Sequence, residues 1–432
     1  MNFNGQNGST PFMESLVQGT DGNLYGTTEN GGANGFGSVF KMTPLGTLTT
    51  LYSFSNTTDG AYPTGGLILD NAGESFFGTT SQGGANGLGT VFKITARGTL
   101  TTLHSFNGTD GAFPPSPCVE GSDLNFYGTT SQGGANNLGT VYQMTLDGVL
   151  TTLHSFNGTD GANPGAALTP QTGPDLTFYG TTVNGGTNGL GTIFQITSGG
   201  ALMTLHSFNG TDGANPGAAL TPQTNPSLIF YGTTVTGGTD NLGTVFKITP
   251  DGVLTTLKSF IRTNGANPQA ALQLQPNPGR NLYGTTANGG ANSLGTIFKI
   301  TPAGELTLLH NFSGTDGSNP DGGLILRTSG VFFGVTSAGG SDGLGTAFSL
   351  SIGLAAFVEP LPTFGAVGAS VIILGTQLTG ATSVTFNGVA ASFQVVSASE
   401  ITTSVPTGAT TGPVVVVTPN ATLASNVNFV VP

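Results

Sequence analysis

The sequence contains no tryptophan, a single cysteine and few charged residues. Of its 432 residues 7% are charged, and 9 Lys and Arg stand against 21 Asp and Glu, which gives a formal net charge of −12. Because binding to phosphates requires a basic surface, this balance argues against nucleic acid and against anionic membranes as partners. The lone cysteine, Cys118, excludes a disulfide within the chain, and we predict that it is a buried structural thiol.

Signals for export, anchoring and helices are also missing. The residues from Met1 to Gly5 have neither the charged start nor the apolar run of a signal peptide. The residues before Pro432 form no sortase-type motif, basic tail or hydrophobic anchor helix, so we expect no insertion into a membrane. No stretch has a helical period. The sequence therefore predicts an all-β protein, and it leaves the routes of export and anchoring open.

Glycine is abundant, with 72 residues, and it marks an internal repeat. A phrase of the form aromatic-Gly-Thr-Thr, with Val335 replacing one Thr in the last copy, recurs at intervals of 50 to 52 residues. A fixed period of this length indicates units that bury their apolar faces against one another. The glycines of the seven copies are Gly26, Gly78, Gly128, Gly180, Gly232, Gly284 and Gly334.

Each repeat is interpreted as four short strands. In the second repeat these are residues 66–69, 75–79, 90–95 and 100–106, which are rich in β-branched and aromatic side chains and separated by Asp-Gly, Asn-Gly and Gly-Gly turns. Four strands repeated seven times predict a seven-bladed β-propeller over residues 1–358. The last repeat lacks a recognisable fourth strand. Either residues 353–358 supply that strand, or the blade is closed from elsewhere.

The pattern changes at Glu359, and residues 359–432 form a second predicted domain. Its short alternating strands, with turns every 8–12 residues, are typical of a small immunoglobulin-like β-sandwich. The segment around Leu378–Gly388 has the form G-x-x-L-x-G-A-x-x-V-x-F-N-G, and Val405–Val417 has the form V-P-x-G-A-x-x-G-P-V-x-V. On these motifs residues 361–432 resemble an IPT/TIG domain, a family that serves as spacers, adhesin modules and partner-binding modules.

The repeats resemble a known family too. A Leu-Gly-Thr-Val-Phe-Lys-Ile-Thr segment at Leu88–Thr95 follows Tyr/Phe-Gly-Thr-Thr and precedes Leu-Thr-Thr-Leu-His-Ser-Phe, and all seven copies over residues 3 to about 354 follow this plan. The segment resembles the GloVer-type tandem repeat of bacterial surface proteins. The resemblance implies an extracellular or cell-surface location and no established catalytic residues. Thr, Asn and Ser in place of charged residues agree with that location, and cytoplasmic residence stays open.

Two long loops of each repeat are the predicted recognition surface. The loop between strands 2 and 3 and the loop to the next blade emerge on one face of a propeller, because antiparallel strands alternate in direction. Turn formation explains their Asn and Asp residues, and Ca²⁺ ligation by Asp110, Asp160 and Asp212 is a weaker alternative. The candidate ligand-binding residues are Asn86, Asn107, Asp110, Asn136, Asn157, Asp160, Asn188, Asn209, Asp212, Asp240, Asp316 and Asp342.

Recurring histidines and aromatics are predicted to be structural. His104, His154, His206 and His310 share one position of the fourth strand, which Tyr52 and Lys258 also occupy, so we expect a polar outer edge rather than a metal site. The aromatic residues before the repeat glycines are expected to pack between blades, although they are tempting platforms for sugar. These are Tyr25, Phe77, Tyr127, Tyr179, Tyr231, Tyr283 and Phe333.

The inventory favours recognition over catalysis. Nothing in the sequence brings together two of the carboxylates that break the repeat, and no nucleophile elbow, phosphate loop or zinc motif is present. We therefore predict a noncatalytic adhesion protein that binds a glycan or a surface protein. A structural subunit that assembles into a layer or filament, and a polysaccharide-active enzyme, remain as alternatives. No cofactor is expected. The repeat-breaking carboxylates are Glu14, Glu29, Glu74, Glu120 and Glu305.

Overall fold

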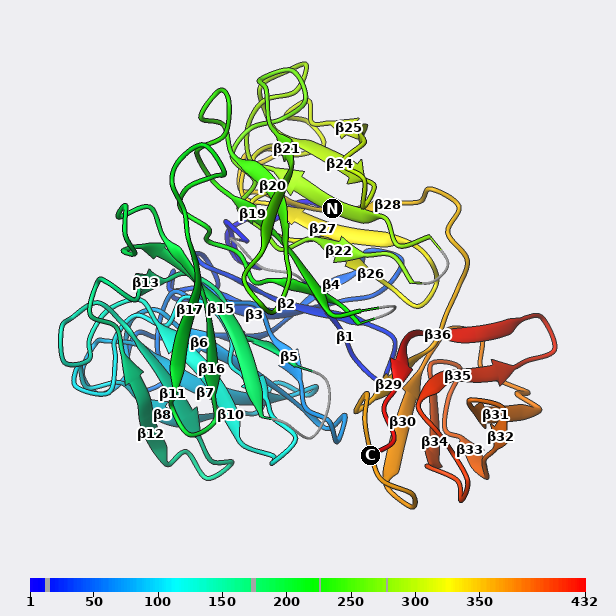
Figure 1. Cartoon of the computed structure of the whole chain (residues 1–432). Helices are drawn as coiled ribbons and strands as arrows, with labels where there is room; N and C mark the ends of the chain where they lie inside the picture. Colours follow the sequence, from blue (N-terminus) through cyan, green and yellow to red (C-terminus); the bar gives the residue numbers. More distant parts are fainter. Residues whose placement is uncertain (12–15, 172–175, 225–226, 277–278) are drawn as a thin grey trace.

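The structure is a computed structural model that describes residues 1–11, 16–171, 176–224, 227–276 and 279–432 (Figure 1). The all-β prediction is confirmed, because the described residues form strands, bridges and turns and include no helix. Nor does the described part of the chain hold a helix long and apolar enough to cross a membrane.

Each repeat forms its own antiparallel sheet, which we call repeat sheets 1 to 7 in chain order. The first strands are β1 (Val17–Gln18), β5 (Ile68–Leu69), β9 (Val119–Glu120), β14 (Thr169–Pro170), β18 (Thr221–Gln223), β22 (Gln273–Leu274) and β26 (Ile325–Leu326). The second strands are β2 (Leu24–Thr28), β6 (Ser75–Thr80), β10 (Phe126–Thr130), β15 (Thr177–Asn184), β19 (Ile229–Thr234), β23 (Leu282–Thr286) and β27 (Phe332–Thr336). The third strands are β3 (Ser38–Met42), β7 (Thr90–Thr95), β11 (Thr140–Met144), β16 (Thr192–Thr197), β20 (Thr244–Ile248), β24 (Thr296–Ile300) and β28 (Thr346–Leu350). The fourth strands are β4 (Leu48–Ser53), β8 (Leu100–Ser105), β12 (Leu150–Ser155), β17 (Leu202–Ser207), β21 (Leu254–Ser259) and β25 (Leu306–Asn311), and sheet 4 has an extra strand, β13 (Ala162–Pro164).

The core lies between neighbouring sheets. In five repeats the aromatic residue that precedes the repeat glycine packs on a ring of the next repeat, as for Tyr25 on Phe76, with centroids 4.1 Å apart, and Phe77 on Phe126, at 4.3 Å. Tyr231 and Phe333 instead share a core cluster with a leucine of the next repeat. All seven aromatics are buried, so their predicted packing role is confirmed. Each sheet thus hides its apolar face against the next, and the sheets follow one another around a centre in a propeller-like arrangement (Figure 1).

The repeat glycine is required by close packing within each sheet. A Cβ atom on Gly180 would lie 2.4 Å from the ring of Phe194, and the other repeat glycines face the equivalent ring in the same way. Real Cβ atoms do not approach so closely, so any larger residue would displace the ring. The third repeat differs, because Tyr142 stands in the place of the phenylalanine and Cys118 in the place of the usual leucine. The smaller thiol leaves room for the larger ring.

Repeat sheet 7 is completed by the first residues of the chain. Asn2 forms an antiparallel bridge with Thr346, and the Ala347 amide donates to the carbonyl of Met1 at 3.0 Å. Phe3, fully buried, joins a core cluster with residues of repeats 1 and 7. Of the two predicted ways to close the last repeat, closure from elsewhere is therefore the one observed. Residues 353–358 instead lead toward the C-terminal strands, and the Phe357 amide donates to the carbonyl of Thr328 in repeat 7 at 2.9 Å.

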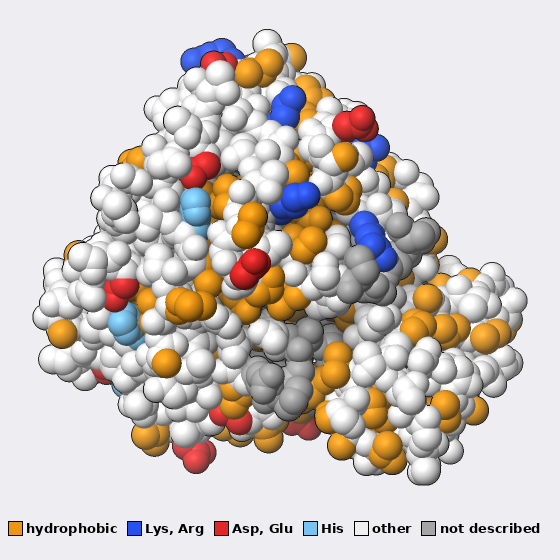
Figure 2. All heavy atoms as spheres, viewed as in Figure 1, with side chains coloured by type: hydrophobic (Ala, Val, Ile, Leu, Met, Phe, Trp, Pro, Cys, Tyr) orange, Lys and Arg blue, Asp and Glu red, His pale blue; other side chains and the backbone are white. Residues whose placement is uncertain are grey.

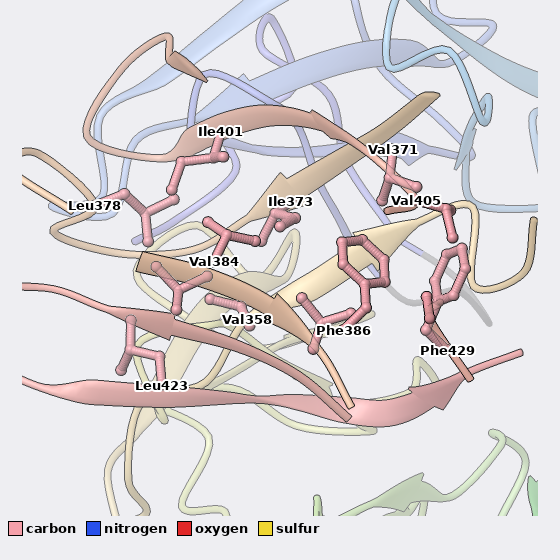
Figure 3. Close-up of a cluster of buried hydrophobic side chains, with 13 residues drawn as sticks. Val358, Val371, Ile373, Leu378, Val384, Phe386, Ile401, Val405, Leu423 and Phe429 are labelled. Carbon is pink, nitrogen blue, oxygen red and sulfur yellow. The ribbon is translucent and has the colours of Figure 1, made fainter. Parts of the chain in front are cut away.

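The C-terminal residues form two further antiparallel sheets over one core (Figure 3). Val358, Val371, Ile373, Phe386 and Phe429 are among the buried side chains between them. Figure 1 shows this pair of sheets in orange and red beside the repeat sheets. One sheet has the order β29 (Glu359–Leu361), β30 (Ser370–Leu374), β34 (Glu400–Ser404), β33 (Phe393–Val395), and the other β32 (Val389–Ala390), β31 (Ser383–Phe386), β35 (Gly412–Val417), β36 (Thr422–Phe429).

Candidate functional site

The two long loops of the repeats meet on one face, as predicted from strand direction. Isolated antiparallel bridges join the loop that enters a sheet to the loop between its second and third strands, for example Ala61 to Gln82 and Ala112 to Gln132. Equivalent bridges link Ala214 to Thr236, Ala266 to Asn288 and Ser318 to Ala338. We call this surface the loop face, and the opposite surface, which carries the short turns, the turn face.

The C-terminal sandwich covers part of the turn face. The Ser399 hydroxyl donates to the carbonyl of Thr20 at 2.7 Å, and the hydroxyls of Thr328 and Thr376 lie 2.9 Å apart. Thr20 and Thr328 belong to the turns after the first strands of repeat sheets 1 and 7. The sandwich therefore leaves the loop face uncovered, and loops held on a rigid scaffold are the usual place for binding residues.

The predicted ligand residues of the first loop have a structural partner. The side-chain amide of Asn86 donates to the Phe106 carbonyl at 2.9 Å, which ties the loop to the start of the next one. Asn136 and Asn188 make the same bond at 2.9 Å to the carbonyls of Phe156 and Phe208. In the fifth and seventh repeats the position is held by Asp240 and Asp342, which are exposed. Among the five predicted residues of the first loop, these two aspartates are therefore the ones without this bond to the next loop.

The predicted residues of the second loop form a closed hydrogen-bond network. Asp110 accepts from the backbone and side-chain amides of Asn107, both at 2.9 Å, while Thr109 donates its amide and hydroxyl to Asn107 Oδ1. This is the turn-forming interpretation of these residues. Asn209 and Asp212 build the same network, and Asn157 and Asp160 share its backbone bond, at 3.0 Å. Ser313 replaces the asparagine beside Asp316.

Each of these aspartates also faces the recurring histidine of its own repeat, a pairing that the sequence interpretation missed. His104 Nε2 lies 3.0 Å from Asp110 Oδ2, and the corresponding distances are 2.9 Å for His154 with Asp160, 2.9 Å for His206 with Asp212 and 2.8 Å for His310 with Asp316. A constant spacing of six residues was the available signal. A second signal was that the repeat with Lys258 in place of His has Asn264 in place of Asp.

Hydrogen bonds lower the pKa of two loop carboxylates, Asp316 and Asp59. Partial burial alone would raise the pKa of Asp316, but hydrogen bonds from Ser313 and His310 lower it overall. In the first repeat, burial would raise the pKa of Asp59, and hydrogen bonds from Ser55, Thr57 and Tyr52 lower it. Within the described residues, no group of three or more His, Cys, Asp or Glu is placed to hold a metal ion. The loop carboxylates are thus used to shape their own loops.

Seven equivalent residues on the loop face, one from each repeat, have a left-handed backbone conformation. The residue before the conserved proline of each second loop has a positive φ, between 52° and 57°, in all seven repeats. Asparagine tolerates this conformation, but a bulky side chain there is strained, and such strain gathers at functional sites. Tyr62 and Phe113 are therefore notable. The seven residues are Thr10, Tyr62, Phe113, Asn163, Asn215, Asn267 and Asn319.

We call the part of the loop face that carries Tyr62, Phe113, Phe36, Gln82 and Gln132, residues of neighbouring repeats, the aromatic sector. The rings of Phe36 and Tyr62 meet edge to face with centroids 5.8 Å apart, and both side chains are half-buried. Gln82 and Gln132 are exposed beside them, through the bridges from Ala61 and Ala112. In later repeats the same place is held by amide pairs, such as Asn184 with Asn163 at 3.2 Å. The replacement of Asn by an aromatic residue was the signal in the sequence.

The repeat-breaking carboxylates are not brought together. Glu29 lies on the loop face, where burial raises its pKa, whereas Glu74 and Glu305 lie in turns of the opposite face and Glu120 ends strand β9. Glu14 lies outside the described residues. A carboxylate that sequence reasoning missed, Asp321, is 5% exposed. Its oxygens accept from the Ser337 hydroxyl at 2.5 Å and from the Gln269 amide at 3.2 Å, and burial raises its pKa.

The single cysteine is structural, as predicted. Cys118 is fully buried in the cluster between repeats 2 and 3, and burial raises the pKa of its thiol to about 12. A thiol of that acidity is almost entirely protonated at neutral pH and is a poor nucleophile.

Solved structures with a similar fold include proteins of two kinds. A lectin of Burkholderia pseudomallei, BP39L, superposes with a TM-score of 0.56 at 10% identity, covering 80% of this chain and 97% of the lectin. A protein provisionally assigned as a 6-phosphogluconolactonase of Bacteroides uniformis superposes with a TM-score of 0.51 at 16% identity, covering 76% and 97%. At such identities the likeness extends to the fold alone. A search of the curated proteins gave no match.

The family of the chain is assigned from its repeats. The Gloeobacter/Verrucomicrobia repeat matches residues 1–176 and 173–394, which together take in all seven copies of the aromatic-Gly-Thr-Thr phrase or its variant. The match agrees with the period and with the one-sheet-per-repeat architecture. The chain belongs to the Gloeobacter/Verrucomicrobia repeat family.

Proposed function

We propose that this protein is a noncatalytic recognition protein of the extracellular space or cell surface, which binds a neutral glycan on its loop face. In this proposal residues 1–358 are a seven-bladed β-propeller, and residues 359–432 are an IPT/TIG domain that serves as spacer on the turn face. The observation that carries the proposal is the aromatic sector, where Tyr62 and Phe113 are held in strained backbone beside Gln82 and Gln132.

The chemistry of this sector suits a sugar. Aromatic rings offer large, rigid apolar faces, onto which the C–H face of a pyranose can pack. Glutamine amides both donate and accept hydrogen bonds, as sugar hydroxyls do. The strain at Tyr62 and Phe113 has a cost that Asn would avoid, which supports a role for the rings themselves.

The charge distribution favours a neutral ligand. The net charge of −12 arises from sparse acidic residues, and Figure 2 shows a few scattered charged side chains, some beside one of opposite sign, on a face that is mostly uncharged. Such a surface offers hydroxyl and amide groups and no basic patch. A glycan of a neighbouring surface, or a glycosylated surface protein, is the partner that we expect, and nucleic acid is not.

Screening on a glycan array tests the proposal. We expect the purified chain to bind neutral glycans, and Tyr62→Ala and Phe113→Ala to weaken binding at least tenfold in a follow-up titration. Leu146→Ala is the matched control, because Leu146 is 55% exposed on the turn face. Equal binding by all four proteins, or binding of acidic glycans alone, would refute recognition by the aromatic sector.

A second candidate function is hydrolysis of a sugar lactone, and Asp321 is the observation that favours it. A buried carboxyl group with raised pKa beside Ser337 and Gln269 is the type of group that serves as a general acid or base. A similar fold occurs in the protein assigned as a phosphogluconolactonase. Accelerated opening of glucono-δ-lactone that is lost in Asp321→Asn would establish this function and exclude the noncatalytic one. Buffer-rate hydrolysis would leave recognition as the function.

A further inference from the structure

A cavity of about 410 Å³ lies on the axis of the repeat sheets. Segments in or just before the first strands of all seven sheets contribute to its wall, including Leu67, Ala167 and Ala219. Glu359, Leu361 and Leu374 of the C-terminal sandwich close it from the turn face. Its volume falls within the range of about 300–1,000 Å³ that is typical of sites for small molecules.

The wall is mostly apolar and made of small residues. In repeats 3 to 5 the wall consists mainly of glycine, alanine and proline. Repeats 1, 2 and 7 contribute larger side chains, such as Leu16, Leu67 and Ile325. Small side chains leave the space empty that larger ones would fill. An apolar surface of this kind gains free energy when an apolar ligand replaces water, at about 25 cal/mol per Å².

The hydroxyl of Ser116 is not available to a ligand. Ser116 lines the cavity and its hydroxyl makes no hydrogen bond within the described protein, but the hydroxyl oxygen has almost no accessible surface and does not face the empty space. Binding in the cavity therefore depends on apolar contact and on charge.

The charges of the cavity wall disfavour an anionic ligand. None of the described residues that line the cavity is Lys, Arg or His, and the one ionisable group among them is the carboxyl of Glu359. Burial raises the pKa of Glu359, although a hydrogen bond from Asn426 acts in the opposite direction. An anionic ligand would find no counter-charge and would face this carboxyl group.

We infer that the axial cavity is a binding site for a compact, mainly apolar small molecule that carries no anionic group. This site is separate from the aromatic sector of the loop face, so its occupancy does not depend on the proposed glycan recognition. The sandwich closes one end of the site and thereby makes the C-terminal domain part of the binding pocket.

Calorimetric titration of the full chain with three probes of one shape tests the inference. The probes are 1-adamantanol, 1-adamantylammonium and adamantane-1-carboxylate. We expect the alcohol and the ammonium to bind with one site per chain, and the carboxylate to bind at least tenfold more weakly. Failure of all three to bind at millimolar concentration, or preferred binding of the carboxylate, would overturn the inference.

Two variants place the probe in the cavity. Ala219→Phe fills the space and should reduce the affinity for 1-adamantanol at least tenfold, whereas Ala303→Phe, on an exposed turn, should leave it unchanged. Ala167→Leu fills less of the space and should weaken alcohol binding about fivefold while the circular dichroism spectrum stays that of the parent protein. If Ala219→Phe does not fold, Ala167→Leu decides alone. Unchanged affinity in a folded Ala219→Phe or in Ala167→Leu would refute the site.

Discussion

Asn2 pairs with Thr346 across 344 positions of sequence, in an antiparallel bridge that adds the start of the chain to the last repeat sheet. Phe3 follows this bridge into the core between repeats 7 and 1, where it contacts Phe40 edge to face at 5.4 Å. The ring of sheets is therefore held closed by main-chain bonding and by one buried aromatic side chain.

Loss of this side chain should weaken the whole ring. Phe3→Ala is expected to lower the free energy of unfolding by about 3–5 kcal/mol, since it leaves a large cavity in a closed core. Urea denaturation followed by fluorescence of the tyrosines measures the change. Leu45→Ala, at a position 98% exposed, should stay within about 0.5 kcal/mol of the parent. A similar loss in both variants would contradict the closure role of Phe3.

The third repeat should show coupled substitutions. The Tyr142 hydroxyl is buried without a hydrogen-bond partner, so Tyr142→Phe is expected to raise stability by about 1 kcal/mol. Cys118→Leu alone should destabilise by about 1–3 kcal/mol, because the larger side chain meets the tyrosine. The double variant restores the pairing of the other repeats and should recover most of this loss. Additive effects in thermal unfolding would show that the two side chains do not compete for space.

Asp59 should stabilise the first repeat in a pH-dependent way. Its folded-state pKa is depressed, so its contribution is present above the unfolded value of about 4 and is lost as the pH falls through the folded value. Asp59→Asn is expected to cost about 1–3 kcal/mol at pH 7 and much less at pH 2–3. Unfolding titrations from pH 2 to 7 measure this, with exposed Asp251→Asn as control. A cost independent of pH would contradict the role of the charged carboxylate.

Light scattering after size-exclusion chromatography separates recognition from assembly. For a recognition protein we expect one species with the mass of the chain, 43.2 kDa, with and without Ca²⁺. Ordered polymers in negative-stain images would favour the structural-subunit alternative instead. Polymers that form only with Ca²⁺ would in addition revive the calcium hypothesis for Asp110, Asp160 and Asp212.

Much of the fold follows from local patterns. Residues 75–79 and 90–95 were predicted as strands of the second repeat and lie in β6 and β7, because alternation and turn residues act over short distances. Strand direction alone placed the long loops on one face. The predicted buried roles of Tyr25 and Cys118 followed from their regular positions in apolar strands.

The features that were not predicted from the sequence depend on contacts that local patterns do not reveal. Histidine and aspartate positions such as His104 and Asp110 were considered separately, so their pairing was not foreseen. Phe3 precedes the first strand of repeat 1, and nothing local identified repeat 7 as its partner. The aromatic sector was hidden because a positive φ at Tyr62 is a property of the backbone. Closure of the axial cavity by Glu359 depends on how the C-terminal sandwich packs against the repeat sheets, and no motif near Glu359 predicts that packing.

The bridge between Asn2 and Thr346 also has a consequence for biosynthesis. Residues 1–3 leave the ribosome more than 340 residues before their partner strand β28, so they must wait without that partner while six complete repeats are made. A chain truncated before Thr346 therefore cannot close the ring of repeat sheets. Its first and last sheets would each leave one face unpaired and exposed to proteases and to other chains.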